Sequence, residues 1–234
     1  MDILDLFFPK KCVGCQRTGS YLCKICFSKI SYVEKPVCPV CQRQAVGGKT
    51  HPGCRGKLRL DGLIVPLKYK WPIDAAIKKI KYRWIYTIEE ILVLFIVRDF
   101  WKSDAPVFDL LMPIPLHAKR KRWRGFNQAE IIVNDLAGRF GVKVGNQLVR
   151  VRETKTQVGL TKDERKRNIS GAFSLCPVPF ERTQDKQGKL SDVRGKNILL
   201  VDDVYTTGAT MGEACKVLKK AGAGEVWALC AALG

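Results

Sequence analysis

The sequence predicts an α/β protein, with a twisted, mainly parallel sheet and flanking helices, preceded by a small cysteine-rich zinc-binding domain. From residue 58 onward, apolar runs of strand length alternate with amphipathic segments, and this alternation is typical of parallel sheets covered by helices. In addition, seven of the ten cysteines fall within the first 54 residues. We therefore expect two domains, a zinc-binding one over residues 1–57 and an α/β one over residues 58–234.

Four ligand pairs occupy the N-terminal region, each with two residues between the ligands: CVGC, CKIC, CPVC and HPGC. This spacing lets a tight turn direct both side chains at one ion, so four pairs can make two tetrahedral zinc sites. The candidate ligands are Cys12, Cys15, Cys23, Cys26, Cys38, Cys41, His51 and Cys54.

Other interpretations of these cysteines are weaker. A disulfide framework is disfavoured because no secretory signal is visible, and a redox site would normally use a single pair at a helix start. The ligand pairing stays open between a sequential arrangement and a crossed one, and His51 is either a ligand or a solvated loop residue. Four protein ligands leave no open position, so we expect structural zinc, which would stabilise about 55 residues with few large apolar side chains.

The elements of the second domain follow in order from apolar patterning. Residues 63–69 predict a strand, at an edge of the sheet because of Pro66. Pro72 opens a helix with apolar residues at helical spacing, and a second, largely buried helix spans 84–101. Residues 108–115 form an apolar run bounded by prolines, which is typical of a parallel strand.

The remaining elements lie in the C-terminal half. Residues 127–140 have apolar positions at helical spacing, with Gly141 as a stop. Residues 171–175 predict a short strand, and residues 175–195, with two prolines and two glycines, predict a mobile loop. The last elements are a strand over 198–201, a helix over 210–221 and a strand over 225–232.

The formal net charge of +19, from 41 Lys and Arg against 22 Asp and Glu, indicates a polyanionic partner. Nucleic acid, phosphorylated small molecules or an anionic membrane surface fit, although a basic surface can also serve solubility alone. The first residues, MDILDLFFPKKC, carry acids where a secretory signal has a basic leader, so we expect a cytoplasmic protein. The longest apolar run, ILVLFIV at 91–97, is far shorter than the roughly 20 residues of a membrane span.

Two adjacent aspartates, Asp202 and Asp203, stand at the expected end of the strand over 198–201, where ligands collect in parallel sheets. Like charges this close oppose each other's ionisation, so we expect a group from outside the chain to compensate. The loop that follows opens onto a helix start, where backbone N–H groups and the helix dipole favour an anion. Its residues suit a phosphate monoester: Thr206, Thr207, Gly208, Ala209 and Thr210.

A sugar phosphate satisfies both parts of this stretch, with vicinal hydroxyls facing the acids and a 5-phosphate in the loop. The loop lacks the lysine and spacing of a P-loop and is not a GxGxxG pattern. An acidic turn that caps a helix is the alternative, but two aspartates and three threonines exceed what capping requires.

The stretch ILLVDDVYTTGAT at 198–210 resembles the 5-phosphoribosyl-1-pyrophosphate (PRPP) motif of type I phosphoribosyltransferases. Together with RGFNQAE at 124–130, TQVGLTKDERKRNISGAF at 156–173 and the N-terminal CxxC cluster, it resembles the competence protein ComF family. The resemblance implies a type I phosphoribosyltransferase-like domain behind a double zinc ribbon. The chain departs from the family at the fourth ligand pair, where the family often has CxxC and this chain has HPGC.

The resemblance implies that Asp202 and Asp203 bind ribose hydroxyls, that the loop from Thr206 to Thr210 holds the 5-phosphate, and that magnesium accompanies PRPP. A nucleophile, commonly a base nitrogen, would displace pyrophosphate from C1 of ribose through a transition state with positive charge on the sugar. Cations after Pro115 and in the candidate lid over 152–167 would hold the pyrophosphate. Further substrate contacts follow from the family pattern: Arg124, Asn127, Gln128, Gln157, Arg165 and Asn168.

The family is linked to natural DNA uptake, which implies single-stranded DNA and a competence helicase or other DNA-uptake proteins as partners. Trp123 within KRKRWRGF, and Trp71 and Tyr82 near lysines, would stack on bases; core-filling aromatics coated by lysines are the alternative. Two hypotheses stay open: a phosphoribosyltransferase with an unidentified acceptor, and a non-catalytic adaptor that senses PRPP or binds single-stranded DNA. A zinc-finger regulator of transcription is disfavoured, because no recognition helix follows the ligands.

Overall fold

The fold is built on one parallel sheet, and the predicted α/β class is confirmed. The computed structural model describes residues 9–80, 86–154, 159, 161–176 and 193–234. The main sheet has six strands in the order β1-β8-β7-β3-β4, with β2 also paired to β8, and its pairings are parallel. The strands are β1 (Gly62–Ile64), β2 (Leu67–Lys68), β3 (Leu110–Pro113), β4 (Lys143–Val144), β7 (Ile198–Tyr205) and β8 (Val226–Leu233).

Strands β7 and β8 form the centre of the sheet and begin as unbroken apolar runs, as strands buried on both faces do. β7 pairs with β8 as far as Tyr205, whereas its pairing with β3 ends at Val201, opposite Pro113. The chain leaves β3 toward β4 on one side and leaves β7 toward β8 on the other, so the strand order reverses between β3 and β7. In open parallel sheets, such a reversal creates a ligand-binding crevice beyond the carboxyl ends of the two strands.

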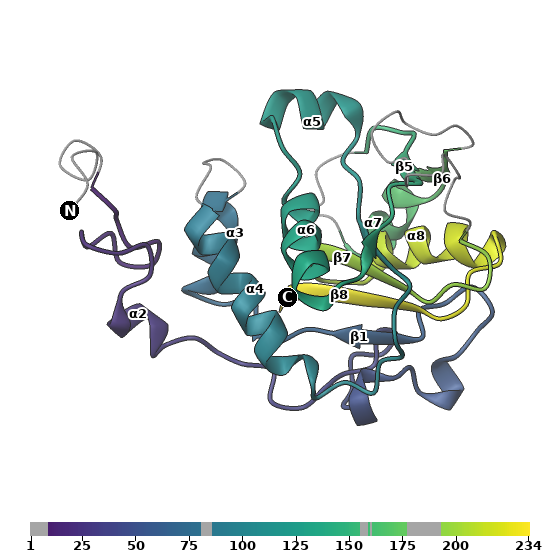
Figure 1. Cartoon of the computed structure of the whole chain (residues 1–234), viewed down its shortest axis with the longest axis horizontal. Helices are drawn as coiled ribbons and strands as arrows, with labels where there is room; N and C mark the ends of the chain where they lie inside the picture. The colour runs from purple at the N-terminus through teal and green to yellow at the C-terminus, as the bar shows by residue number, and fades with distance from the viewer. Residues whose placement is uncertain (1–8, 81–85, 155–158, 160, 177–192) are drawn as a thin grey trace.

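Four helices cover the sheet: α3 (Ile73–Ile80), α4 (Tyr86–Phe100), α6 (Gln128–Phe140) and α8 (Ala209–Lys220) (Figure 1). The first three share one hydrophobic cluster with the sheet, and α8 belongs to a second cluster. Strand β7 supplies both, because Leu199 and Val201 join the first cluster while Ile198 and Leu200 join the second. Helix α8 and the loop before it therefore lie on the opposite face from α6.

Helix α4 carries the longest apolar run and is largely buried, as expected. Leu92, Val93 and Ile96 are buried in the first cluster, whereas Leu94 faces outward. Within the part of the chain that the structure describes, no helix has the length and apolar character needed to cross a membrane.

The N-terminal region packs directly against the β1 and β2 edge of the sheet. Its buried apolar residues join the clusters of the sheet, Ile30 the first and Val37 the second. The Val33 N–H donates to the Pro66 carbonyl at 2.8 Å, which ties the region to the segment between β1 and β2. From residue 9 onward, the region contains one short helix and two 3-10 turns: α2 (Lys24–Phe27), η1 (Val46–Gly48) and η2 (Pro52–Cys54).

Several boundaries differ from the sequence-based expectation. The strand expected over 63–69 is interrupted at Pro66, which has no N–H to donate, and forms β1 and β2; β1 does lie at the edge of the sheet. The strand expected to end at Val201 continues to Tyr205, because β8 keeps pairing with it beyond the end of β3. The expected loop over 175–195 lies largely outside the described residues.

Polar segments contain elements that their composition did not predict. The strand predicted over 171–175 is present as β6 (Phe173–Leu175), but its antiparallel partner β5 (Leu148–Arg150) and helix α7 (Lys162–Ile169), which lies between them in sequence, were not predicted. The start of α7 is marked not by an apolar face but by a capping box of Thr161 and Glu164. The basic helix α5 (Ala118–Arg124) was also unpredicted, and in Figure 1 it stands at the top of the molecule, away from the sheet.

Candidate functional site

The carboxyl end of β7 places the predicted aspartates at the strand-order reversal. Asp202 and Asp203 are half-buried and lie within β7, beyond its last pair with β3 at Val201. The Asp203 N–H donates a hydrogen bond to Asp202 Oδ1 at 2.9 Å. This backbone N–H therefore offsets part of the negative charge on Asp202.

Arg150, which the sequence did not single out, stands beside Asp202 at the end of β5. Burial, together with the positive charges of Arg120 and Arg152, lowers the pKa of Arg150 to about 10, and the Asp202 carboxylate acts in the opposite direction. Its Nη2 donates to Thr154 Oγ1, but its buried Nε has no hydrogen-bond partner among the described residues. Arg150 therefore brings an incompletely compensated positive charge to the crevice.

Arg120 and Arg152 connect the surrounding elements to this charge. Arg120 of α5 donates through Nη2 to the Thr154 carbonyl at 3.3 Å. Arg152 donates through Nη2 to the carbonyls of Asn168 and Ser170, at 2.8 and 2.7 Å, and so fixes the end of α7. Arg120, Arg150 and Arg152 therefore repel one another, and binding an anion such as pyrophosphate between them would relieve this repulsion.

The loop between β7 and α8 has the geometry of an anion cradle. Gly208 precedes α8 with a φ of 72°, a left-handed conformation. A Cβ there would lie 2.3 Å from Tyr205 Oη, so the position requires glycine. Thr207 Oγ1 accepts from the Ala209 N–H at 3.4 Å. Together with the threonine hydroxyls, the N–H groups and dipole at the start of this 12-residue helix favour a phosphate.

Three predicted substrate contacts, Arg124, Asn127 and Gln128, lie together where α6 begins. Arg124 Nη1 donates to Gln128 Oε1 at 2.7 Å. Asn127 Nδ2 donates to the Ile114 carbonyl at 3.0 Å and its side-chain oxygen caps α6, so this amide holds the helix against the exit of β3. The buried Gln128 Nε2 and His117 Nδ1 have no hydrogen-bond partner in the described part of the chain, which leaves polar groups for a ligand.

The other predicted contacts fall on or near α7. Gln157 lies outside the described residues. Arg165 and Asn168 are half-buried on α7, which packs against α8. The Gly171 N–H, just beyond α7, donates to Glu213 Oε1 of α8 at 2.9 Å. The described part of the expected lid is therefore a capped helix that packs on α8, and α8 follows directly after the predicted phosphate loop.

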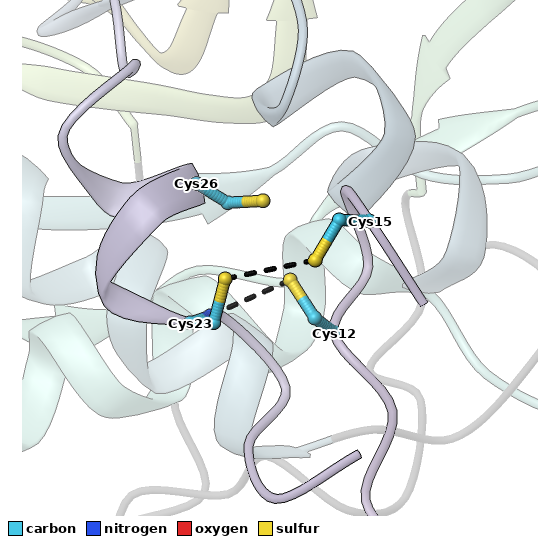
Figure 2. A group of neighbouring side chains, drawn as sticks. All are labelled: Cys12, Cys15, Cys23 and Cys26. Carbon is cyan, nitrogen blue, oxygen red and sulfur yellow. Dashed lines mark hydrogen bonds between the residues drawn. The ribbon is translucent and has the colours of Figure 1, made fainter. Parts of the chain in front are cut away.

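The structure brings the N-terminal ligands together in sequential order, which was one of the two pairings left open. The first group is Cys12, Cys15, Cys23 and Cys26, whose sulfur atoms lie within 4.8 Å of one another (Figure 2). Cys15 and Cys23 Sγ are 3.7 Å apart, and the Cys23 N–H points at Cys12 Sγ at 3.4 Å. Four converging thiols fit zinc and leave no position for water, as in structural sites.

The second group is Cys38, Cys41, His51 and Cys54, with ligand atoms within the same 4.8 Å. His51 Nδ1 lies 3.3 Å from Cys41 Sγ, while His51 Nε2 lies 2.9 Å from the Gln44 carbonyl. A carbonyl can only accept, so Nε2 carries the proton and Nδ1 is left to bind a metal. The HPGC pair thus supplies a donor set of three sulfurs and one nitrogen that fits zinc.

Local charges prepare one thiol in each group for ionisation. Arg43, through its side chain and its backbone N–H, lowers the pKa of Cys41 to about 6. Burial opposes the ionisation of Cys12, but backbone N–H groups, foremost that of Cys23, outweigh it and lower its pKa to about 6. Thiolates are the form that binds zinc, so each group offers one thiol that is readily ionised near neutral pH, whereas burial raises the pKa of Cys26 and of Cys54.

Arg150 and Tyr205 are the residues whose importance sequence analysis missed. Arg150 is one of 41 Lys and Arg, and nothing in its local pattern separates a buried arginine from a solvated one. Tyr205 lies inside the aspartate motif, and an aromatic residue so close to the predicted phosphate loop could have indicated its role. Its hydroxyl is buried against Gly208, and burial raises its pKa well above the usual range, so it remains a hydrogen-bond donor.

These features define the class of protein as a phosphoribosyltransferase-type α/β domain behind a zinc ribbon. They are two acids at a strand-order reversal, a glycine-containing loop at a helix start directly after them, and two zinc-type clusters that precede both in sequence. Known families match the same two parts, since residues 3–55 match the double zinc ribbon domain and residues 125–233 the phosphoribosyl transferase domain. The chain belongs to the ComF family of competence proteins.

Three relatives illustrate this membership. Competence protein F of Haemophilus influenzae is 29% identical, over 97% of this chain and 99% of that protein. DNA utilization protein YhgH of Salmonella typhi is 31% identical over 70% of each chain. Competence protein ComFC of Bacillus subtilis is 25% identical, over 86% of this chain and 79% of its own length.

Proposed function

We propose that this protein binds PRPP in the crevice between β3 and β7 and transfers its phosphoribosyl group to an acceptor. One observation carries the proposal: two acids at the end of a central strand run directly into a left-handed glycine and a helix start. A carboxylate pair recognises vicinal hydroxyls, and the helix start recognises a phosphate, and PRPP holds both on one pentose.

Each part of the crevice has a role in this proposal. Asp202 and Asp203 accept hydrogen bonds from the ribose hydroxyls, and residues 206–210 hold the 5-phosphate. Arg150, with Arg120 beside it, attracts the pyrophosphate, because its charge is half-buried and only partly compensated. The aspartate oxygens are also the hard donors that magnesium prefers, and magnesium bound with PRPP would neutralise charge on the pyrophosphate.

The reaction breaks the bond between C1 of ribose and a pyrophosphate oxygen, and the electron pair leaves with the pyrophosphate. An acceptor nucleophile forms the new bond at C1 and loses its proton. The chain's contribution is to hold the sugar and the leaving group in place while positive charge develops on the ribose, with α7 helping to exclude water. A non-catalytic PRPP sensor would use the same groups without an acceptor.

Calorimetry with PRPP and magnesium, and an assay of pyrophosphate release with a panel of bases, test this proposal. We expect the wild type to bind PRPP in the micromolar range, and the double variant Asp202→Asn, Asp203→Asn to lose at least about a hundredfold in affinity with its fold intact, since charge-assisted hydrogen bonds are lost at both positions. Steady release of pyrophosphate supports the transferase, and binding without release supports the sensor. Equal affinity of the double variant and the wild type would remove this site.

A second function, binding of single-stranded DNA, is favoured by helix α5. Trp123 on α5 is 72% exposed and stands among Lys119, Lys121 and Arg122 on one short helix. An exposed ring between cations suits base stacking with backbone neutralisation. Trp123→Ala is expected to weaken binding of a labelled oligothymidine roughly tenfold, while the exposed Trp101→Ala, a matched control, leaves it unchanged.

The proposed cellular role and location follow from the relatives and from the zinc clusters. The names of the relatives, competence and DNA utilization proteins, support a role in DNA uptake, with a competence helicase or another DNA-uptake protein as the partner. We place the protein in the cytoplasm, where the thiols of two zinc clusters stay reduced. We place the boundary between the zinc-ribbon-like and phosphoribosyltransferase-like domains at residues 57 and 58.

A further inference from the structure

Two hydrogen bonds join the second metal cluster to the phosphate loop. Tyr205 Oη donates to the Pro39 carbonyl at 2.7 Å, and Gln42 Nε2 donates to the Thr206 carbonyl. Pro39 lies between the ligands Cys38 and Cys41, and Gln42 directly follows Cys41. The two bonds therefore join the CPVC turn and the residue after it to Tyr205, the last residue of β7, and to Thr206, the first residue of the loop that we assign to the 5-phosphate.

The Tyr205 side chain packs between the phosphate loop and the CPVC turn. Its hydroxyl is buried between the Pro39 carbonyl and Gly208, whose missing Cβ leaves the space that the hydroxyl fills. A carbonyl and a hydroxyl that bond in a buried place fix each other, since losing one partner leaves the other unsatisfied. The left-handed turn at Gly208 is thus held against the metal-binding turn.

Gln42 sets the orientation of a peptide unit in the loop. In a planar trans peptide the C=O and the following N–H point in opposite directions. Because the Thr206 carbonyl points at Gln42, the Thr207 N–H points away from the CPVC turn. Orienting this N–H prepares a phosphate donor before any ligand arrives, which reduces the ordering cost of binding.

The CPVC turn itself is fixed around its ligands. The Gln42 N–H donates to the Cys38 carbonyl at 2.9 Å, and the Cys38 N–H donates to the Arg43 carbonyl at 2.9 Å. Gln42 has a φ of 57°, so its side chain leaves the turn from a left-handed residue. A metal that holds Cys38 and Cys41 therefore also holds the Pro39 carbonyl and the Gln42 side chain.

The first metal cluster has the same local design but a different neighbour. Gln16 follows Cys15 with a φ of 64°, as Gln42 follows Cys41. Its side-chain oxygen accepts from Lys79 Nζ of α3 at 3.2 Å, and the Gly14 carbonyl accepts from Trp71 Nε1 at 3.3 Å. The first cluster thus contacts α3, whereas the second contacts the phosphate loop.

We propose that the second metal cluster positions the phosphate loop, with Gln42 and Tyr205 as positioning residues, so that metal bound there sets the affinity for PRPP while metal in the first cluster does not. The choice of PRPP as the ligand rests on the proposed function. The coupling between the second metal cluster and the loop does not depend on which ligand the loop binds.

The test uses the zinc-loaded full chain and compares equivalent positions in the two metal clusters. Gln42→Asn shortens the side chain while keeping a residue that tolerates the left-handed region, and Gln16→Asn is its control in the first cluster. Tyr205→Phe removes the hydroxyl and keeps the ring. Cys41→Ser and Cys15→Ser each remove one ligand from one cluster. For every variant, zinc content, PRPP affinity and hydrogen exchange of residues 204–210 are measured well below the thermal midpoint.

We expect Gln42→Asn and Tyr205→Phe to weaken PRPP binding about three- to tenfold each with zinc content unchanged, as for loss of one hydrogen bond. Cys41→Ser should lose one zinc and at least as much affinity. Cys15→Ser should also lose one zinc, with affinity within about twofold of the wild type. Equal losses in Cys41→Ser and Cys15→Ser, or wild-type affinity in Gln42→Asn and Tyr205→Phe, would overturn the inference.

Hydrogen exchange separates this inference from the proposed function. If the wild type binds no PRPP, the proposed function fails, but the coupling still predicts faster exchange of residues 204–210 in Gln42→Asn and Cys41→Ser than in Gln16→Asn and Cys15→Ser. Exchange that is the same in all four variants contradicts the coupling whether or not PRPP binds.

Discussion

The Asp202 carboxylate attracts the Arg150 guanidinium electrostatically, although the two residues belong to different sheets. Arg150 ends β5 of the small antiparallel pair, and Asp202 lies on β7 of the main sheet. The positive charges of Arg120 and Arg152 oppose the same guanidinium, and the Arg150 residue is half-buried. A charge in this position reduces the stability of the fold unless a ligand compensates it. Such a residue is typical of a binding site.

We therefore expect Arg150→Met to weaken PRPP binding at least about tenfold. The free energy of unfolding should stay level or rise by about 1 kcal/mol, because an incompletely compensated, half-buried cation is replaced by an apolar side chain of similar length. Calorimetry and urea unfolding measure the two quantities. Arg122→Met, which removes an exposed charge from α5, should change neither by much. A loss of stability without a loss of affinity would assign Arg150 to the scaffold alone.

Gly208→Ala tests the geometry of the phosphate loop. The added Cβ would meet Tyr205 Oη at 2.3 Å in a residue with a φ of 72°, so both a clash and backbone strain are expected, together about 2–4 kcal/mol in urea unfolding. Gly141→Ala is the matched control, with a φ of 65° and no atom within 4 Å of the added Cβ. It should lose about 1–2 kcal/mol, for strain alone. Equal losses at the two positions would mean that Tyr205 does not press against the loop.

Glu89 predicts a dependence of stability on pH. It is 4% exposed in the first turn of α4, and burial raises its pKa to about 7 from an ordinary value of 4.5. Between these values the folded protein binds more protons than the unfolded chain, so stability falls as pH rises from about 4.5 to 7 and stays low above. The difference corresponds to at most roughly 3 kcal/mol.

Glu89→Gln should therefore be more stable than the wild type at pH 8 by about 2–3 kcal/mol, with a smaller advantage at pH 5.5, in urea unfolding of the zinc-loaded protein. Glu90→Gln, at the exposed neighbouring position, should follow the wild type at both pH values. An advantage of Glu89→Gln that does not change with pH would mean that the carboxyl does not titrate in this range.

His51 decides how many metal ions the chain holds. With two complete clusters we expect two zinc ions per chain by mass spectrometry, about one in His51→Ala, and two again in His51→Cys, which restores a fourth thiol. A strong chelator should remove both ions and unfold the N-terminal region, because its turns are closed by the ligands. Two ions in His51→Ala would show that this histidine is not a ligand.

Apolar periodicity made most of the sheet and its helices predictable from sequence. The boundaries of β3, β7, β8, α6 and α8 all lie within four residues of the predicted ones, because each element buries a continuous run or one regular face. Helices α5 and α7 were not predictable in this way. Their stability depends on contacts distant in sequence and, for α7, on a capping box in a segment of almost entirely polar residues.

The candidate site divides in the same manner. Asp202, Asp203 and Gly208 are consecutive or nearly so, and a local motif indicates them. The contribution of Arg150 depends on which cations the tertiary structure buries, and the contact between Tyr205 and Pro39 joins residues 166 positions apart. Sequential pairing of the metal ligands was one of two possibilities, and the docking of each ligand turn against its own side of the α/β domain could not be read from spacing.

The order of strands also constrains biosynthesis. Strand β8, the last in sequence, lies between β1 and β7, so β1 has no neighbour in the main sheet until residues 226–233 have left the ribosome. A growing chain can load its metal clusters early, but it must keep an open sheet edge protected for most of its translation. Nascent chains arrested before residue 226 should therefore depend on chaperones far more than the released protein does.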